Sequence, residues 1–125
     1  MINLIIDAAS DKIFFKIITG SKSYTNEFSN SRENFDKFVV LLFNFLKKNN
    51  INIQEITNIF INQGPGKFSS IRASISTVKA LKVTNSLNLY GFNSEQIKDQ
   101  NYEEIIDLFN KGKLKKNLIK PIYSS

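Results

Sequence analysis

Short apolar runs separated by polar turns occupy the N-terminal part of the chain. Residues 2–7 form an apolar run that ends in Asp7 and is followed by small residues, which predicts a buried strand leading into a turn. Residues 12–18 and 23–28 are rich in apolar or loosely alternating side chains and flank a turn signal at Gly20. These runs together predict three antiparallel strands.

A helix is predicted from residue 30 to about residue 48. Asn30 is followed three positions later by Glu33, and this spacing is typical of a pair that caps a helix N-terminus. Apolar side chains then recur at three- and four-residue spacing, which predicts a face packed on the sheet: Phe35, Phe38, Leu42, and Phe45 or Leu46.

The opposite side of this helix is apolar as well, through Val39, Val40, Leu41 and Phe43. One apolar face can cover the sheet, whereas soluble proteins seldom leave a second contiguous apolar face exposed. We therefore expect Val39, Val40 and Phe43 to meet another helix or another chain.

The second half of the chain alternates strands and helices. Residues 56–61 and 87–92 predict buried strands, and a helix is expected between them, from Phe68 or Ser69 to about Val83. Two further short helices are expected, at residues 94–100 and 102–110.

The whole pattern predicts an α/β fold with a mixed five-stranded sheet and two main helices, which fits one ribonuclease-H-like half of the actin-like ATPase architecture. At 125 residues, the chain is long enough for one domain with a core and short for two. We place this domain at residues 1–95, followed by a short helical remnant and tail at residues 96–125. No apolar run reaches the roughly 18 residues that span a bilayer, so we expect a cytoplasmic protein with no membrane contact.

A glycine-rich turn, Gly64-Pro65-Gly66, leads into the second main helix. With Lys67 beside it, such a turn at a helix N-terminus can cradle an anion. Pro65, however, lacks an amide donor, which favours a turn that only positions the helix.

Along the helix after this turn, small side chains recur on one side and would let another helix approach closely: Ala73, Ser76, Thr77 and Ala80. Phe68, at the start of the helix, is expected to anchor in the core. Arg72 is expected to pair with an acid, either on a partner or on the first helix.

Composition removes most familiar enzyme chemistry. The chain has no histidine and no cysteine, which excludes disulfides, thiolate metal sites and the commonest general base. The net charge of +6 favours contact with nucleic acid, yet only two of the 17 basic residues are arginine, the residue preferred at bidentate phosphate sites. A basic cluster near the C-terminus either touches RNA phosphates or is simply solvated: Lys111, Lys113, Lys115 and Lys116.

Two segments resemble the TsaB (YeaZ) family, over residues 1 to about 95. That family has an Ile-Asp-Thr-Ser-like end to its first strand and a Gly-Pro-Gly-x-Phe-Thr-Gly-hydrophobic-Arg turn. The corresponding segments here are Ile6-Asp7-Ala8-Ala9-Ser10 and Gly64-Pro65-Gly66-Lys67-Phe68-Ser69-Ser70-Ile71-Arg72. Family members carry a second ribonuclease-H-like half, so the resemblance implies a shortened form without a closed nucleotide cleft.

The resemblance implies a non-catalytic scaffold that binds the paralogue TsaD, the transferase that forms threonylcarbamoyladenosine on tRNA. The ATPase TsaE is implied as a further partner, and a homodimer through the same two helices is the alternative assembly. No cofactor or metal is expected. In actin-like ATPases an acid at the position of Asp7 helps to hold a metal-bound phosphate, but without the second half we favour a vestigial acid that caps a turn.

Two other functions remain open from the sequence. A basic tRNA-binding module would show steep salt dependence of direct tRNA binding, whereas we expect tRNA contact to be indirect or weak. A vestigial ATP-binding enzyme would turn over ATP with magnesium through Asp7.

Overall fold

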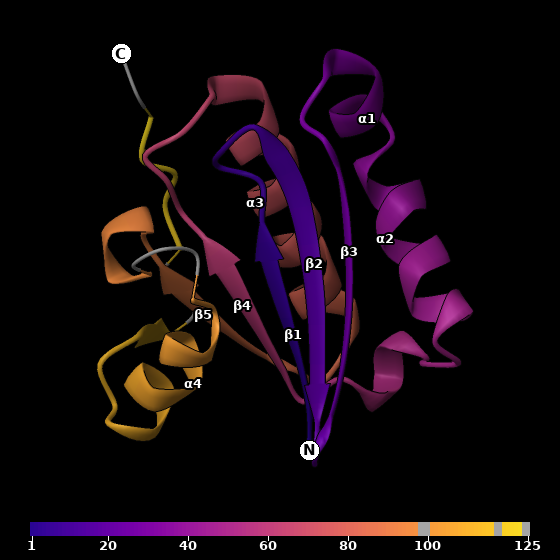
Figure 1. Cartoon of the computed structure of the whole chain (residues 1–125), viewed down its shortest axis with the longest axis vertical. Coiled ribbons are helices and arrows are strands. Elements are labelled where there is room, and N and C mark those ends of the chain that lie inside the picture. The colour runs from indigo at the N-terminus through magenta and orange to yellow at the C-terminus, as the bar shows by residue number, and fades with distance from the viewer. Residues whose placement is uncertain (98–100, 117–118, 124–125) are drawn as a thin grey trace.

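A single mixed sheet forms the centre of the chain in the computed structural model, which describes residues 1–97, 101–116 and 119–123 (Figure 1). Its six strands are β1 (Ile2–Asp7), β2 (Lys12–Thr19), β3 (Lys22–Ser29), β4 (Asn58–Asn62), β5 (Asn88–Phe92) and β6 (Lys115–Lys116). The strand order is β3-β2-β1-β4-β5-β6. Strands β1, β2 and β3 pair antiparallel, whereas β4 pairs parallel with both β1 and β5. The predicted mixed α/β sheet is therefore confirmed.

The sheet has one strand more than the five predicted. The sixth strand, β6, pairs antiparallel with β5 through Lys115 and Lys116 alone. Two lysines at a sheet edge carry no apolar alternation, because neither face of so short an edge strand packs on a core. The other five strands lie within two residues of their predicted bounds.

In the described part of the chain, four helices pack around the sheet: α1 (Arg32–Asp36), α2 (Phe38–Lys48), α3 (Phe68–Thr84) and α4 (Glu103–Asn110). Two short 3₁₀ turns, η1 (Ile53–Glu55) and η2 (Ser94–Gln96), follow α2 and β5. The helix predicted at residues 94–100 is shortened to η2, and its residues 98–100 lie outside the described part of the chain. Within the described ranges no helix combines the length and apolar character needed to cross a bilayer.

The predicted helix from residue 30 to residue 48 is wrong at its start and in its continuity. It is broken at Lys37 into α1 and α2, and Ser31 caps α1 by accepting from the backbone N–H of Asn34 at 3.3 Å. Asn30 does not cap α1, because its side chain points to the turn after β1: Nδ2 donates to the carbonyl of Ala8 at 2.9 Å, and Oδ1, the atom that a cap would use, has no partner among the described residues. Asn30 thereby ties the end of β3 to the turn after β1.

One face of the sheet packs on α2 and α3 and contains the larger core. Figure 1 shows α3 behind the strands and α2 beside it. Phe15 of β2 lies 5.5 Å from Phe38 and 5.6 Å from Phe45, measured between ring centroids, and all three side chains are buried. From α3, Ile71 and Val78 complete the contact. Burying each such side chain contributes about 1.5–3 kcal/mol, which makes this face the main source of stability.

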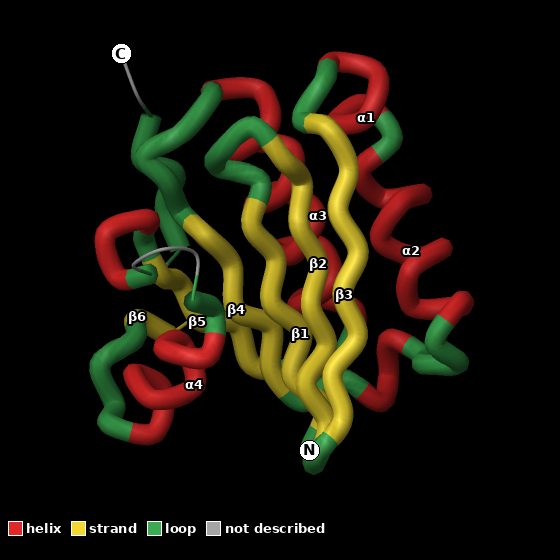
Figure 2. Tube along the Cα trace, in the orientation of Figure 1, coloured by secondary structure: helices red, strands yellow, loops and turns green. Residues whose placement is uncertain are grey.

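The other face packs on α4, at the lower left of Figures 1 and 2. This smaller core contains Ile5, Phe60, Phe92, Ile97, Tyr102 and Ile105. Phe109 of α4 meets Phe60 edge-on at 5.3 Å, and Tyr102, just before α4, stacks on Phe14 at 4.3 Å. The residues beyond position 95 therefore cover a sheet face that would otherwise expose large apolar side chains.

Candidate functional site

The carboxyl ends of β1 and β4 bring the polar motif residues together. Because these two strands are parallel neighbours, Asp7 at the end of β1 lies beside Asn62 at the end of β4. The Asp7 carboxylate is buried, and its Oδ1 accepts from Asn62 Nδ2 and from the backbone N–H of Ala9, each at 3.0 Å. Asp7 therefore closes the turn that follows β1.

Tyr102 forms a hydrogen bond to the other oxygen of the Asp7 carboxylate. Its hydroxyl donates to Asp7 Oδ2 at 2.7 Å. Burial of the phenol, and secondly the negative charge of Asp7, raise the pKa of Tyr102 far above its usual value. Tyr102 is therefore protonated throughout the physiological range and remains a donor. In the sequence Tyr102 is separated from Asp7 by most of the chain, and no local pattern pointed to it.

This arrangement uses Asp7 within the protein. Three donors within the chain share its two oxygens. Among the described residues, no three acidic side chains gather in a position to hold a metal ion.

The Gly64-Pro65-Gly66 turn is packed between two other segments of the chain. Gly64 has a φ of +114°, its N–H donates to Asn62 Oδ1 at 2.8 Å, and its carbonyl accepts from Ser94 at 3.0 Å. A side chain at Gly64 would collide with the carbonyl of Ile122, and one at Gly66 would lie 2.8 Å from the Cα of Ala9. The glycines are thus required by close backbone approach, as expected of a turn that positions α3.

The C-terminal segment lies along this turn. Ile122 donates its N–H to the carbonyl of Gln63 at 2.7 Å, and Tyr123 pairs with Gly66 in an isolated parallel bridge. Gln63 Nε2 donates in turn to the carbonyl of Lys120 at 3.0 Å. The end of the described chain is therefore fixed beside the motif.

Phe68 is not a core anchor, contrary to the prediction. It is the first residue of α3 and 54% exposed, with its ring 4.7 Å from that of Tyr123. Ile71, in the same turn of α3, is buried in the core, whereas the Phe68 ring meets the C-terminal segment instead. Arg72 forms no ion pair within the described residues, and its guanidinium lies 5.7 Å from the Phe68 ring.

The apolar outer side of α2 is left uncovered. We call Val39, Val40 and Phe43 the α2 patch; they are 50%, 57% and 38% exposed. On the same helix Leu42 and Phe45 are buried. The structure therefore brings the three predicted residues of α2 together on one exposed surface.

The small residues of α3 also lie toward the surface. Ser76 and Ala80 are exposed, whereas Ala73 and Thr77 are half-buried and joined by a 2.8 Å hydrogen bond from the threonine hydroxyl to the alanine carbonyl. Sequence reasoning missed Val83, which is 86% exposed. Its spacing of three residues from Ala80 was the signal that places it on the same side of α3.

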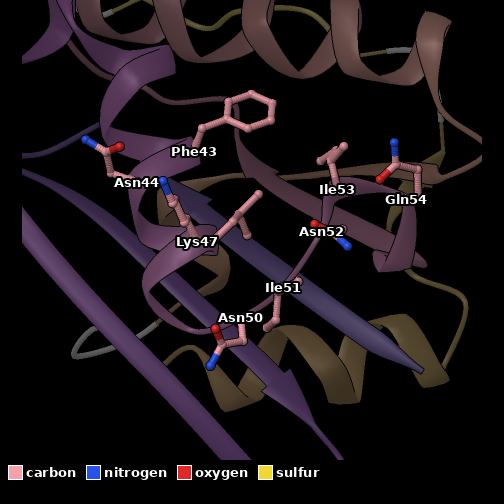
Figure 3. A pocket seen from close by; sticks show the side chains of 9 residues that line it. Phe43, Asn44, Lys47, Asn50, Ile51, Asn52, Ile53 and Gln54 are labelled. Atoms are coloured by element: carbon pink, nitrogen blue, oxygen red, sulfur yellow. The ribbon is translucent and has the colours of Figure 1, made fainter.

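A groove of about 620 Å³ adjoins the α2 patch, between the end of α2 and η1. Figure 3 shows Phe43 of α2 and Ile53 of η1 facing the gap between the two segments. Leu46, Lys47 and Ile51 also contribute to its walls. The apolar surface of α2 therefore continues into a hollow instead of ending at Phe43.

The predicted basic cluster is divided by the structure. Lys115 and Lys116 form β6, and Lys113 lies just before them, whereas Lys111 caps the end of α4. Lys120, which is not part of the predicted cluster, joins Lys113, Lys115 and Lys116 around a hollow beside Gln63.

One family model matches the sequence of this chain, and solved structures match its fold. A sequence model of the family described as TsaD, tRNA N6-adenosine threonylcarbamoyltransferase, matches residues 29–98. No curated protein matches the sequence itself.

Among solved structures, YeaZ from Pseudomonas aeruginosa superposes with a TM-score of 0.72 at 14% identity, over 89% of this chain and 50% of that one. A crystallised, uncharacterised protein with similarity to peptidase YeaZ, from Pseudomonas aeruginosa, gives 0.72 at 15% identity, over 81% and 47%. The chain thus spans about half the length of these structures. The predicted likeness to YeaZ is confirmed in the fold. Because the family model spans more than half of the sequence, the chain belongs to the TsaD family of tRNA N6-adenosine threonylcarbamoyltransferases.

Proposed function

We propose that this chain is a non-catalytic scaffold subunit that binds TsaD and supports the formation of threonylcarbamoyladenosine on tRNA. The observation that carries the proposal is the α2 patch, in which three apolar side chains of a well-packed helix remain exposed. Membership of a tRNA-modification family supplies the reaction in which such a subunit would act.

Helix-to-helix docking is the interaction that this surface suits. Apolar side chains on α2 offer area to remove from water, at about 25 cal/mol per Å². The small residues on α3 leave room for a second helix to approach its backbone. By docking in this way, this chain would stabilise the conformation of TsaD that presents the matching helices.

Two observations support a non-catalytic role. The chain has no histidine or cysteine, so a nucleophile would lack the usual activating base. Asp7, the acid implied by the resemblance, is held by Asn62, Ala9 and Tyr102. We expect no magnesium-dependent ATP turnover by the purified chain, and measurable turnover lost in Asp7→Asn would favour the enzyme alternative.

The test is the mass of the assembly with TsaD from the same genome, measured by light scattering. We expect a one-to-one complex with the native chain and at least a tenfold weaker one with Phe43→Asp or Val40→Asp, because a charge would be buried against apolar groups. Asn101→Asp is the matched control: it adds the same charge at the start of α4, on the opposite face of the sheet, and keeps an acceptor for the N–H of Glu103.

Circular dichroism of each variant separates lost binding from lost folding. A native chain that stays monomeric beside TsaD contradicts the proposal. A chain that forms a dimer by itself, disrupted by Val40→Asp, would show that the α2 patch serves a second copy instead. TsaE is the further proposed partner, to be added once the first complex has formed.

A further inference from the structure

The edge of the sheet opposite β3 carries a hollow lined by lysines. Two adjoining cavities of about 370 and 240 Å³ share Gln63, Lys115 and Lys120 in their walls. We call this site the lysine hollow and define it by Lys113, Lys115, Lys116 and Lys120, which come from β6, the residues before it and the C-terminal segment. Separate segments of the chain thus place four positive charges around one concave surface.

Among the described residues, these lysines have no acidic partner. The ion pairs of the described residues involve Lys12, Lys16, Arg32 and Lys37, and none involves the lysine hollow. No aspartate or glutamate is among the described residues that line either cavity. The charge of the hollow is therefore available to an external anion.

Two neutral donors add to this charge. Asn93 Oδ1 accepts from the N–H groups of Glu95 and Gln96, and Gln96 Oε1 accepts from the N–H of Asn93. Because both amide oxygens are used, the orientation of each amide is fixed and its NH₂ group has no partner among the described residues. Asn93 and Gln96 line the smaller cavity, so these donors complement the lysines.

The walls of the hollow are held in place by packing. Gln63 lies against Gly91, where any larger side chain would collide with it and with Ile119. The Gln63 amide also bonds to the carbonyl of Lys120 at 3.0 Å, which fixes the backbone that carries this lysine. Because these walls are already ordered in the folded chain, less conformational entropy is lost when a ligand binds.

We propose that the lysine hollow binds the phosphodiester backbone of RNA. Lysines from separate segments, together with two amide donors, suit several phosphates of one backbone, and such phosphate contacts supply most of the affinity of proteins for nucleic acid. The choice of tRNA as the natural RNA rests on the proposed function. The lysine hollow uses no residue of the α2 patch, so both surfaces can be occupied at once.

The experiment measures binding of a fluorescein-labelled, unmodified tRNA transcript by anisotropy, from about 50 to about 300 mM potassium chloride. The test variant is Lys115→Glu with Lys120→Glu. The matched control is Lys47→Glu with Lys48→Glu at the end of α2, which changes the net charge from +6 to the same +2. We expect the test variant to bind about tenfold more weakly and to lose about two units of the salt slope, and the control to change less than threefold.

Equal losses in the two double variants would overturn the proposal, because net charge alone would then explain binding. So would no tRNA binding at low salt, or lysine-dependent binding to phosphatidylserine vesicles without binding to tRNA. Light scattering with TsaD distinguishes this proposal from the previous one: the test variant should still form the complex, and Phe43→Asp should still bind tRNA.

Discussion

The carboxyl edge of the sheet and the outer side of α2 differ in whether their side chains have partners within the chain. At the edge, the buried Asp7 carboxylate has a donor on each oxygen, and Asn62 bonds in turn to Gly64 and Ser94. On α2, the side chains of Val39, Val40 and Phe43 have apolar surface that no other part of the described chain covers. The polar residues at this edge are thus satisfied internally, whereas the uncovered surface of α2 lies where no family motif was recognised.

This difference separates structural from interaction residues. A fully bonded buried carboxylate resists replacement because its donors would be left without partners. An exposed apolar side chain contributes little to the isolated fold, so its removal should affect only association. Substitutions of Asp7, Tyr102 and Val40 test that separation.

The largest effect on stability is expected for Asp7→Ala. The change leaves the Tyr102 hydroxyl and the Asn62 amide buried without their acceptor, and we expect a loss of about 3 kcal/mol in the free energy of unfolding. Urea denaturation followed by circular dichroism at pH 7 measures it. Asp107→Ala, at an exposed position of α4, should change the same quantity by less than about 0.5 kcal/mol. Equal effects would mean that Asp7 is not a structural residue.

A smaller effect is expected from Tyr102→Phe, and it should depend on pH. The pKa of Tyr102 is raised in the folded state, so the folded chain keeps this proton above pH 10, where an unfolded tyrosine loses it. The stabilisation is complete below about pH 10 and falls as pH rises, by up to about 1.4 kcal/mol per pH unit.

Urea denaturation between pH 8 and pH 11 should therefore show a steeper loss of stability for the native chain than for Tyr102→Phe. Lysine titration is common to both proteins and cancels in the comparison. Parallel profiles would show that the Asp7–Tyr102 hydrogen bond does not shift the titration.

The smallest effect on stability is expected for Val40→Asp. Val40 is exposed near the start of α2, where an acid also favours the helix dipole, so unfolding should change by less than about 0.5 kcal/mol. Leu42→Ala, two residues along at a buried site, should cost about 2–5 kcal/mol in the same denaturation experiment. A large loss from Val40→Asp would mean that the α2 patch contributes to the fold and is not free for a partner.

Most of the fold was predictable because its elements are encoded locally. Apolar runs marked β1, β2, β4 and β5, loose alternation marked β3, and three- and four-residue spacing marked α2 and α3. The two-sided apolar character of α2 likewise indicated that Val39, Val40 and Phe43 would not pack on the sheet, since only one side of a helix can face it. Leu41, assigned to the same side, is instead partly buried against the core.

What could not be predicted depends on contacts between distant segments. The Asp7–Tyr102 hydrogen bond joins residues 95 positions apart, and neither local sequence signals it. Phe68 looked like a core residue because it is aromatic, but its environment is set by Tyr123. Asn30 looked like a cap because of Glu33, yet backbone carbonyls of the β1–β2 turn bind its amide.

The packing of α4 on the sheet also determines when the protein can finish folding. Strands β1 and β4 are complete by residue 62, yet Phe60 and Ile5 have no cover until Tyr102 and Ile105 have been synthesised. During translation, a nascent chain that ends at β5 therefore exposes this apolar face of the sheet. Folding intermediates with exposed apolar surface are prone to aggregation. Folding can be completed only after Tyr102 and Ile105 have been synthesised. The hydrogen bond from Tyr102 to Asp7 of β1 is among the least local contacts of the described chain.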